Sequence, residues 1–221
     1  MLQMEYAGTA GKSRTLLCLG AHCDDIEIGC GGTVLSWTRA NSNLSVVWVV
    51  LSSSAMREKE ARASAERFLG GAMQQKVIVK TFRNGYFPFI GAEIKDFFED
   101  LKQEVSPDLV LTHYRDDRHQ DHRTVSDLTW NTFRDHLIME YEIPKYDGDL
   151  GAPNFFVPLE KSVCTEKTEA ILDCFVSQAN RQWFTSDTFL ALMRMRGIEA
   201  NSRSGYAEAF YCRKAVLGAT L

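Results

Sequence analysis

The chain has 221 residues, of which 45% are hydrophobic and 24% charged, and its net charge at pH 7 is −4. These values are ordinary for a globular α/β domain, and a chain of this length can bury a sizeable core. The weakly acidic balance argues against a nucleic-acid partner. No apolar run approaches the roughly 20 residues needed to cross a bilayer, which argues against membrane insertion.

The signals for location favour the cytoplasm. The first 14 residues, MLQMEYAGTAGKSR, lack the basic-then-apolar layout of a signal peptide. The six cysteines contain no CxxC pair and fall mostly in apolar runs. That pattern is typical of reduced cysteine, and it disfavours both a disulfide framework and a zinc site made of four thiolates.

Strand-like and helix-like segments alternate along the first part of the chain. Four near-continuous apolar runs predict strands buried on both faces: Arg14–Gly20, Leu44–Leu51, Lys76–Phe82 and Asp108–His113. Helical patterns lie between them, at about Gly32–Ala40, Ala55–Leu69 and Ala92–Val105. This spacing predicts parallel strands joined by right-handed helical crossovers. The expected fold class is therefore α/β: a Rossmann-like open, mostly parallel sheet with helices on both faces, in a single domain over residues 1–221.

The pattern is less regular beyond Val125. We expect a helix to about His136, followed by a strand at Leu137–Ile143. The segment Pro144–Pro158, rich in Pro, Gly and Asp, predicts a long loop that could serve as a lid or as a contact in a homo-oligomer. The last expected elements are helices at about Glu166–Gln178 and Ser186–Met195 and a short apolar tail at Phe210–Leu217.

Two polar clusters begin where predicted strands end. The first is AHCDDIEIGCGG, residues 21–32, and the second is HYRDDRHQDH, residues 113–122; together they hold four of the five histidines. In an open α/β sheet, ligands bind at the carboxyl ends of the strands. The two clusters therefore predict one metal site assembled from two loops.

The residue types in these clusters suit a catalytic divalent metal. Imidazole and carboxylate ligands fit Zn²⁺, and also Fe²⁺ or Co²⁺, and a catalytic site uses three protein ligands. We expect His22, Asp25 and His122 to be those ligands. Asp24 could then accept the proton of an attacking water, and a protonated His119 could stabilise the oxyanion, which together suffice for amide hydrolysis.

Other interpretations of the same residues are open. The sequence GCGG after a strand could be a dinucleotide loop, but it departs from GxGxxG, and two aspartates would repel a pyrophosphate. Asp24 or Asp25 could merely cap the next helix, and the charged run of residues 116–122 could be a solvated loop. We favour the metal site because both clusters would otherwise have to be functionless at once.

The two clusters resemble the signatures of one known family. AHCDDIEIGCGGT is similar to the AHPDDxxxGxGG signature, and DDRHQDHRT to the DxHPDHR signature, of the PIG-L/LmbE-like family of zinc-dependent N-deacetylases. The segment YAEAF, residues 206–210, resembles a closing segment of that family. The resemblance implies zinc ligands at His22, Asp25 and His122, a general base at Asp24, a carbonyl-polarising histidine at His119 and a histidine-orienting carboxylate at Asp121.

This sequence also departs from the family pattern. Cys23 and Gln120 replace two prolines, which removes backbone constraint but no functional group. The sequence RNGY, residues 83–86, stands where the family has an acidic residue after the third strand. Weaker candidates are an ion pair of Arg57 and Glu60 near the site, and sugar or phosphate contacts from Arg123, Tyr141, Trp183 and Arg196.

These observations predict a zinc-dependent N-deacetylase, a hydrolase of a linear amide C–N bond. The resemblance implies a small-molecule substrate, an N-acetylated amino sugar, or a glycoconjugate that carries one. The same site would also suit an amidase of a non-sugar N-acyl amine. From other classes, a non-catalytic carbohydrate- or metal-binding relative and a nicotinamide-dependent oxidoreductase are the alternatives.

Overall fold

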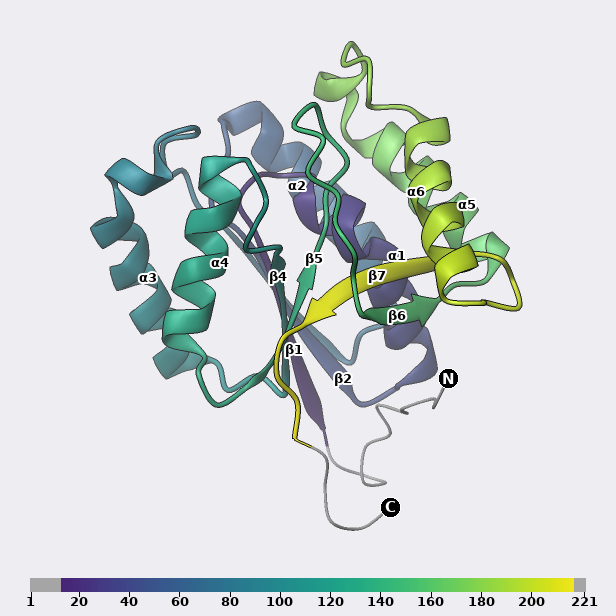
Figure 1. Cartoon of the computed structure of the whole chain (residues 1–221). Helices are drawn as coiled ribbons and strands as arrows, with labels where there is room; N and C mark the ends of the chain where they lie inside the picture. The colour runs from purple at the N-terminus through teal and green to yellow at the C-terminus, as the bar shows by residue number, and fades with distance from the viewer. Residues whose placement is uncertain (1–12, 217–221) are drawn as a thin grey trace.

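A seven-stranded sheet forms the centre of the protein, whose structure, a computed structural model, describes residues 13–216 (Figure 1). The strand order is β3-β2-β1-β4-β5-β7-β6. The strands are β1 (Arg14–Gly20), β2 (Leu44–Val50), β3 (Gln74–Val79), β4 (Leu109–His113), β5 (Leu137–Tyr141), β6 (Phe155–Pro158) and β7 (Ala207–Cys212). Strands β1 to β5 pair in parallel, whereas β7 is antiparallel to both β5 and β6. The predicted open, mostly parallel α/β sheet is confirmed.

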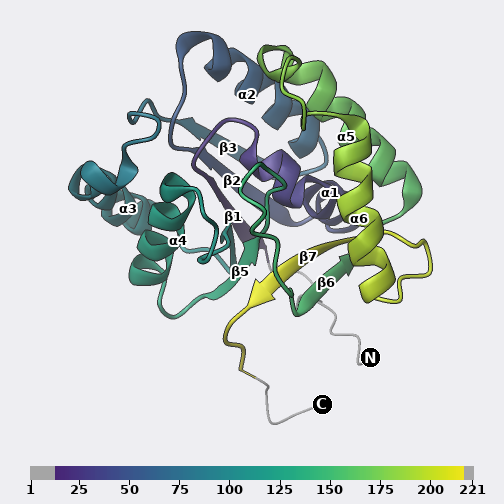
Figure 2. The same ribbon diagram turned by 45° about the horizontal axis from the view of Figure 1, so that its top comes forward.

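Helices cover both faces of this sheet, as predicted. They are α1 (Asp25–Ala40), α2 (Ala55–Leu69), α3 (Gly91–Glu104), α4 (Gln120–Thr132), α5 (Lys161–Cys174) and α6 (Ser186–Glu199), with short 3₁₀ turns at Phe87–Phe89 and Val176–Gln178. Helices α3 and α4 lie on one face, and α1, α2, α5 and α6 lie on the other (Figures 1 and 2).

The apolar runs form strands because the sheet is buried on both sides. Side chains of a strand alternate between its faces. In β1, Leu16 and Cys18 therefore join the core that includes Trp48, whereas Leu17 and Leu19 join the core that includes Phe98 of α3.

The main correction to the predicted elements concerns the first helix. Helix α1 begins at Asp25 and not at about Gly32, and its helical geometry is interrupted at Cys30, where φ is −145° and ψ is 15°. The first polar cluster is therefore mostly the first part of a helix. Tertiary contacts, described below, account for a helix across this glycine-rich stretch.

Several other boundaries differ from prediction. Strand β3 ends at Val79 and not at Phe82, and α4 ends at Thr132 and not at about His136. The predicted loop of residues 144–158 ends in strand β6, while the predicted apolar tail belongs to β7, which begins at Ala207. Leu217 of that tail and residues 1–12 of the segment compared with a signal peptide lie outside the described residues. Within residues 13–216, no helix combines the length and hydrophobicity required to span a membrane.

Candidate metal and catalytic site

The two polar clusters meet where the strand order reverses. Along the chain, β1 leads outward to β2 and β3 on one side, while β4 and β5 continue on the other side of β1. The chain therefore leaves the carboxyl ends of β1 and β4 for helices on opposite faces of the sheet, and such a point is the usual ligand site of these sheets. His22 and Asp25 follow β1, and His122 lies in the first turn of α4, after β4.

The side chains of His22, Asp25 and His122, the three predicted ligands, lie close together. His22 Nδ1 lies 3.2 Å from His122 Nε2 and 3.3 Å from Asp25 Oδ2, and His122 Nε2 lies 3.5 Å from Asp25 Oδ1. Ligand atoms bound at zinc's usual bond lengths in a tetrahedron are about 3.3 Å apart. These separations are of the size found between ligands of one tetrahedral cation, with Asp25 contacting the two histidines through different carboxylate oxygens.

Two further histidines lie beside this triad. The side chains that could hold a metal form two overlapping groups, His22 with His119 and His122, and Asp25 with His113 and His122. In the second group, His113 Nε2 lies 2.9 Å from the main-chain nitrogen of Ala21 and 3.1 Å from Asp25 Oδ2. His113 Nε2 also lies 3.4 Å from the Tyr141 hydroxyl. Each of the two groups holds two of the three predicted ligands, and neither holds all three.

The charges around the triad favour a cation as well. Burial lowers the pKa of His22, but the carboxylates of Asp25 and Asp121 outweigh it and raise that pKa to about 10. The same carboxylates would attract a divalent ion. Burial and the neighbouring His113 lower the pKa of His122 to about 3, so that this imidazole is neutral and offers a lone pair.

Asp117 holds His122 in the orientation a ligand needs. His122 Nδ1 lies 2.9 Å from Asp117 Oδ2, so Nδ1 donates to the carboxylate and Nε2 faces the triad. Asp117 is buried and also lies 3.0 Å from Lys145 Nζ, in the loop after β5. We did not predict a role for Asp117; its place in the DxHxDH pattern was the available signal.

Asp24 lies at the position before α1 but does not cap it. Its side chain makes no capping hydrogen bond, and Oδ1 instead lies 2.9 Å from Arg57 Nη2. Burial raises the pKa of Asp24 above its ordinary value, although Arg57 opposes that shift. The predicted pair of Arg57 and Glu60 is marginal at 4.0 Å, since Glu60 accepts hydrogen bonds from Ser177.

His119 and Asp121 complete the cluster. The rings of His119 and His22 meet edge to face, with centroids 4.9 Å apart. His119 Nδ1 accepts from the Asp121 main-chain N–H at 3.3 Å, which leaves the ring proton on Nε2. Burial and the neighbouring His22 lower the pKa of His119. The lowered pKa favours a neutral ring that can donate from Nε2, whereas we expected a protonated histidine.

Asp121 connects the site to the loop after β3. Its Oδ2 lies 3.3 Å from His22 Nε2 and accepts from the main-chain N–H of Gly85 at 2.6 Å, while Oδ1 accepts from Phe87 N–H at 3.1 Å. The RNGY segment that replaces the expected acidic residue is thus fixed to the site through its backbone. Sequence reasoning could not find this contact, because backbone donors carry no residue signature.

Several weaker candidates are occupied by protein contacts. Tyr141 donates to the carbonyl of Leu19, Arg123 to the carbonyls of Asp117 and Arg118, and Arg196 to Glu142, Glu199 and Gly151. Trp183 packs against the core. Cys23 is buried and its Sγ donates to the carbonyl of Ser52 at 3.5 Å, a packing position.

The glycine-rich stretch serves helix packing. A Cβ on Gly29 would lie 2.1 Å from the ring of Tyr141, and one on Gly32 would lie 2.6 Å from Leu159. Glycine at these positions lets α1 approach its neighbours closely. The structure thus contradicts the dinucleotide-loop interpretation, since these residues lie inside a helix.

Fold and cluster together define the class: an α/β protein with a Rossmann-like sheet and a His- and Asp-rich site that could hold a divalent metal. Residues 17–133, more than half of the chain, match the PIG-L family, described as GlcNAc-PI de-N-acetylase. The chain belongs to this family of deacetylases.

Known proteins share part of the sequence or the fold of this chain. The chain is 26% identical over 154 residues to the uncharacterized deacetylase YaiS of Escherichia coli K12, covering 65% of this chain and 82% of that one. Its fold is similar to that of N,N'-diacetylchitobiose deacetylase from Pyrococcus horikoshii, with a TM-score of 0.67, 18% identity and coverage of 90% and 83%. It is also similar to GalB, the 4-carboxy-2-hydroxymuconate hydratase of Pseudomonas putida KT2440, with a TM-score of 0.76, 18% identity and coverage of 94% and 99%. At such identities the solved structures show the fold alone, and this fold carries more than one reaction.

Proposed function

We propose that this protein is a divalent-metal N-deacetylase, with zinc as the first choice, that acts on an N-acetylated amino sugar or a glycoconjugate carrying one. The observation that carries the proposal is the approach of His22, Asp25 and His122 to within 3.5 Å of one another, a separation typical of ligands that share one cation. The family description and the chitobiose deacetylase of similar fold support the sugar. Free cysteines throughout are consistent with a cytoplasmic location.

The side chains around the triad supply the remaining chemistry. A divalent cation held by the triad would polarise the substrate carbonyl and lower the pKa of the attacking water. Asp24 accepts the proton that this water loses as its oxygen attacks the carbonyl carbon. Its raised pKa, caused by burial, suits a base that must later return the proton.

His119 acts on the other side of the carbonyl. Its Nε2–H donates a hydrogen bond to the carbonyl oxygen, which becomes negatively charged as the tetrahedral intermediate forms. Breakage of the C–N bond then releases the amine, whose nitrogen takes the proton held by Asp24, and acetate leaves with the water's oxygen. Asp121 keeps His22 oriented through Nε2.

Acetate release tests this proposal. The purified protein, with its metal content measured, is incubated with N-acetyl sugars and with their nucleotide and lipid conjugates, before and after chelation. We expect release from at least one sugar, lost on chelation and restored by Zn²⁺. Bound metal with release only from non-sugar N-acyl amines would favour the alternative amidase. A protein without metal and without activity on added Zn²⁺ would overturn the proposal.

A further inference from the structure

Helix α1 is interrupted at Cys30, five residues after the candidate metal ligand Asp25. Cys30 has non-helical backbone angles, so residues 25–29 form a short first turn that carries Asp25. The Ile28 N–H donates to the Asp24 carbonyl at 3.0 Å. A helix break leaves N–H and C=O groups without helical partners, and buried ones must be satisfied elsewhere.

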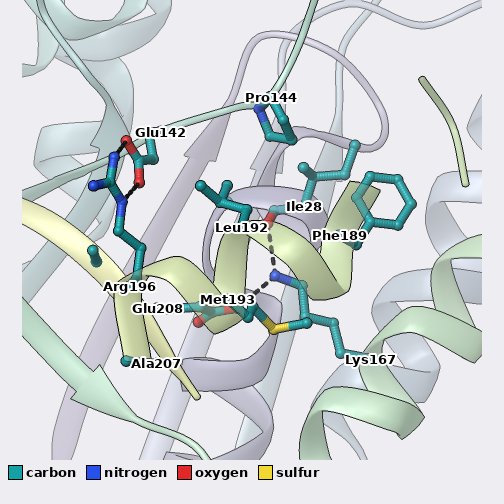
Figure 3. Close-up of a pocket in the computed structure, with 12 residues that line it drawn as sticks. Ile28, Glu142, Pro144, Lys167, Phe189, Leu192, Met193, Arg196, Ala207 and Glu208 are labelled. Carbon is teal, nitrogen blue, oxygen red and sulfur yellow. Dashed lines mark hydrogen bonds and ion pairs between the residues drawn. The ribbon is translucent and has the colours of Figure 1, made fainter. Parts of the chain in front are cut away.

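One buried ion pair satisfies both sides of this break. Figure 3 shows its lysine, Lys167, directed toward the Ile28 carbonyl and toward Glu208. Lys167 of α5 donates from Nζ to the Ile28 carbonyl at 2.7 Å, on the side of the metal site, and to Glu208 Oε1 at 2.6 Å. Glu208 of β7 accepts from the main-chain N–H groups of Gly32 at 2.8 Å and Thr33 at 2.7 Å, on the far side. The carboxylate thereby caps the second part of α1.

The Lys167–Glu208 pair is buried too deeply to bind a ligand directly. The Lys167 and Glu208 side chains are 2% and 3% exposed. The cavity beside them has a volume of about 10 Å³, which leaves room for one water at most. Burying two charges is costly, and apolar residues of similar volume often stabilise a protein as well or better. Stability alone therefore gives a weak reason for a lysine and a glutamate here.

We infer that Lys167 and Glu208 are positioning residues for the metal site, which fix the angle across the α1 break and so direct Asp25 toward His22 and His122. This inference rests on the proposed metal site. It also gives the YAEAF segment a function, because Glu208 is its central residue. The pair touches none of the candidate ligands and would act on them only through the first turn of α1.

Co²⁺ binding to the metal-free protein tests this inference without measuring turnover. Glu208→Gln leaves one acceptor for two N–H groups, and Lys167→Met frees the Ile28 carbonyl. We expect each to raise the dissociation constant for Co²⁺ at least about tenfold, the usual effect of removing support for metal ligands. The visible spectrum of bound Co²⁺ should also change, because it reports the ligand geometry.

A double variant and a matched control distinguish an effect on the position of Asp25 from a general loss of stability. Lys167→Met with Glu208→Gln removes both charges, so its melting temperature should recover toward that of the parent while Co²⁺ affinity stays low. Glu142→Gln weakens the neighbouring buried pair with Arg196, whose hydrogen bonds go to Glu142, Glu199 and Gly151 and not to α1, and should leave Co²⁺ affinity within about twofold. Parent-like affinity and spectrum in the Lys167 and Glu208 variants, or an equal loss in Glu142→Gln, would overturn the inference. Absence of Co²⁺ binding by the unaltered protein would instead overturn the proposed function itself.

Discussion

Asp24 and Asp25 are adjacent in the chain but face different partners. Asp25 contacts His22 and His122, while Asp24 pairs with Arg57 at 2.9 Å. Burial raises the pKa of Asp24, whereas the surrounding histidines hold the pKa of Asp25 well below its usual range despite burial. Neighbouring carboxylates with pKa values moved apart commonly serve different roles in one reaction.

Asp24→Asn should therefore separate turnover from metal binding. Asparagine cannot accept the proton of the attacking water, so we expect kcat to fall by about 10²–10⁴, the usual contribution of a general base. The metal content should stay at the parent value, because the triad is intact. Metal analysis and acetate release on the same preparation check this. Loss of the metal in this variant would mean that the two aspartates have exchanged roles.

Asp117→Asn should lower the affinity for the metal while the protein stays folded. Asparagine removes the negative charge beside His122 Nδ1, which orients the imidazole and makes it a stronger ligand. We therefore expect metal affinity to fall about 10–100-fold. Titration with a competing chelator measures it. Asp116→Asn is the matched control, since Asp116 is an exposed neighbour in the same loop and should have no effect. Equal affinity of parent and Asp117→Asn would remove Asp117 from the support of His122.

At the scale of elements, the packing of α1 against the sheet can be tested by a pair of glycine substitutions. Gly29→Ala would place its Cβ 2.1 Å from Tyr141, which is held in place by its hydrogen bond to Leu19. Such overpacking costs about 1–3 kcal/mol of unfolding free energy. Gly91→Ala, in the first turn of α3, meets no atom within 4 Å and should be neutral or stabilise by up to about 1 kcal/mol. Urea unfolding of both variants checks this; equal stability would contradict the close approach.

Elements with a local sequence signal could be predicted. Elements that depend on contacts between distant parts of the chain could be predicted less well. The apolar run at Arg14–Gly20 sets β1 by itself, because a strand buried on both faces needs no partner pattern. Residues 25–32 have poor helical propensity, and the helix there depends on Tyr141, Lys167 and Glu208, all more than 100 residues away. The antiparallel return of β7 between β5 and β6 is likewise set by pairing across the sheet.

The same division applies to the candidate site. His and Asp grouped after two strands predicted that His22, Asp25 and His122 would meet, because the ends of parallel strands share one edge of the sheet. The supporting contacts were harder to predict. Those of Asp121 depend on backbone N–H groups at Gly85 and Phe87, which carry no residue signature, whereas the only signal for Asp117 was its place in the DxHxDH pattern.

At the scale of the whole molecule, the triad joins the segments on the two sides of the strand-order reversal. His22 and Asp25 belong to the β1–α1 unit on one face of the sheet, and His122 belongs to α4 on the other. A cation held by all three would therefore cross-link the two layers, and it would stabilise the folded protein because the unfolded chain does not hold the three groups together.

This arrangement predicts a melting temperature that depends on the metal. At a free Zn²⁺ concentration 100 times the dissociation constant, binding adds about 2.7 kcal/mol, which for a chain of this length is a rise of about 5–10 °C over the chelated protein. His122→Ala removes one of three ligands and should abolish most of that rise, whereas NAD should cause none in either protein. Thermal unfolding followed by circular dichroism, with and without each ligand, measures the effect. A full Zn²⁺ shift in His122→Ala would exclude His122 as a ligand. A shift with NAD would instead revive the oxidoreductase alternative, which the helical setting of Gly29 and Gly32 opposes.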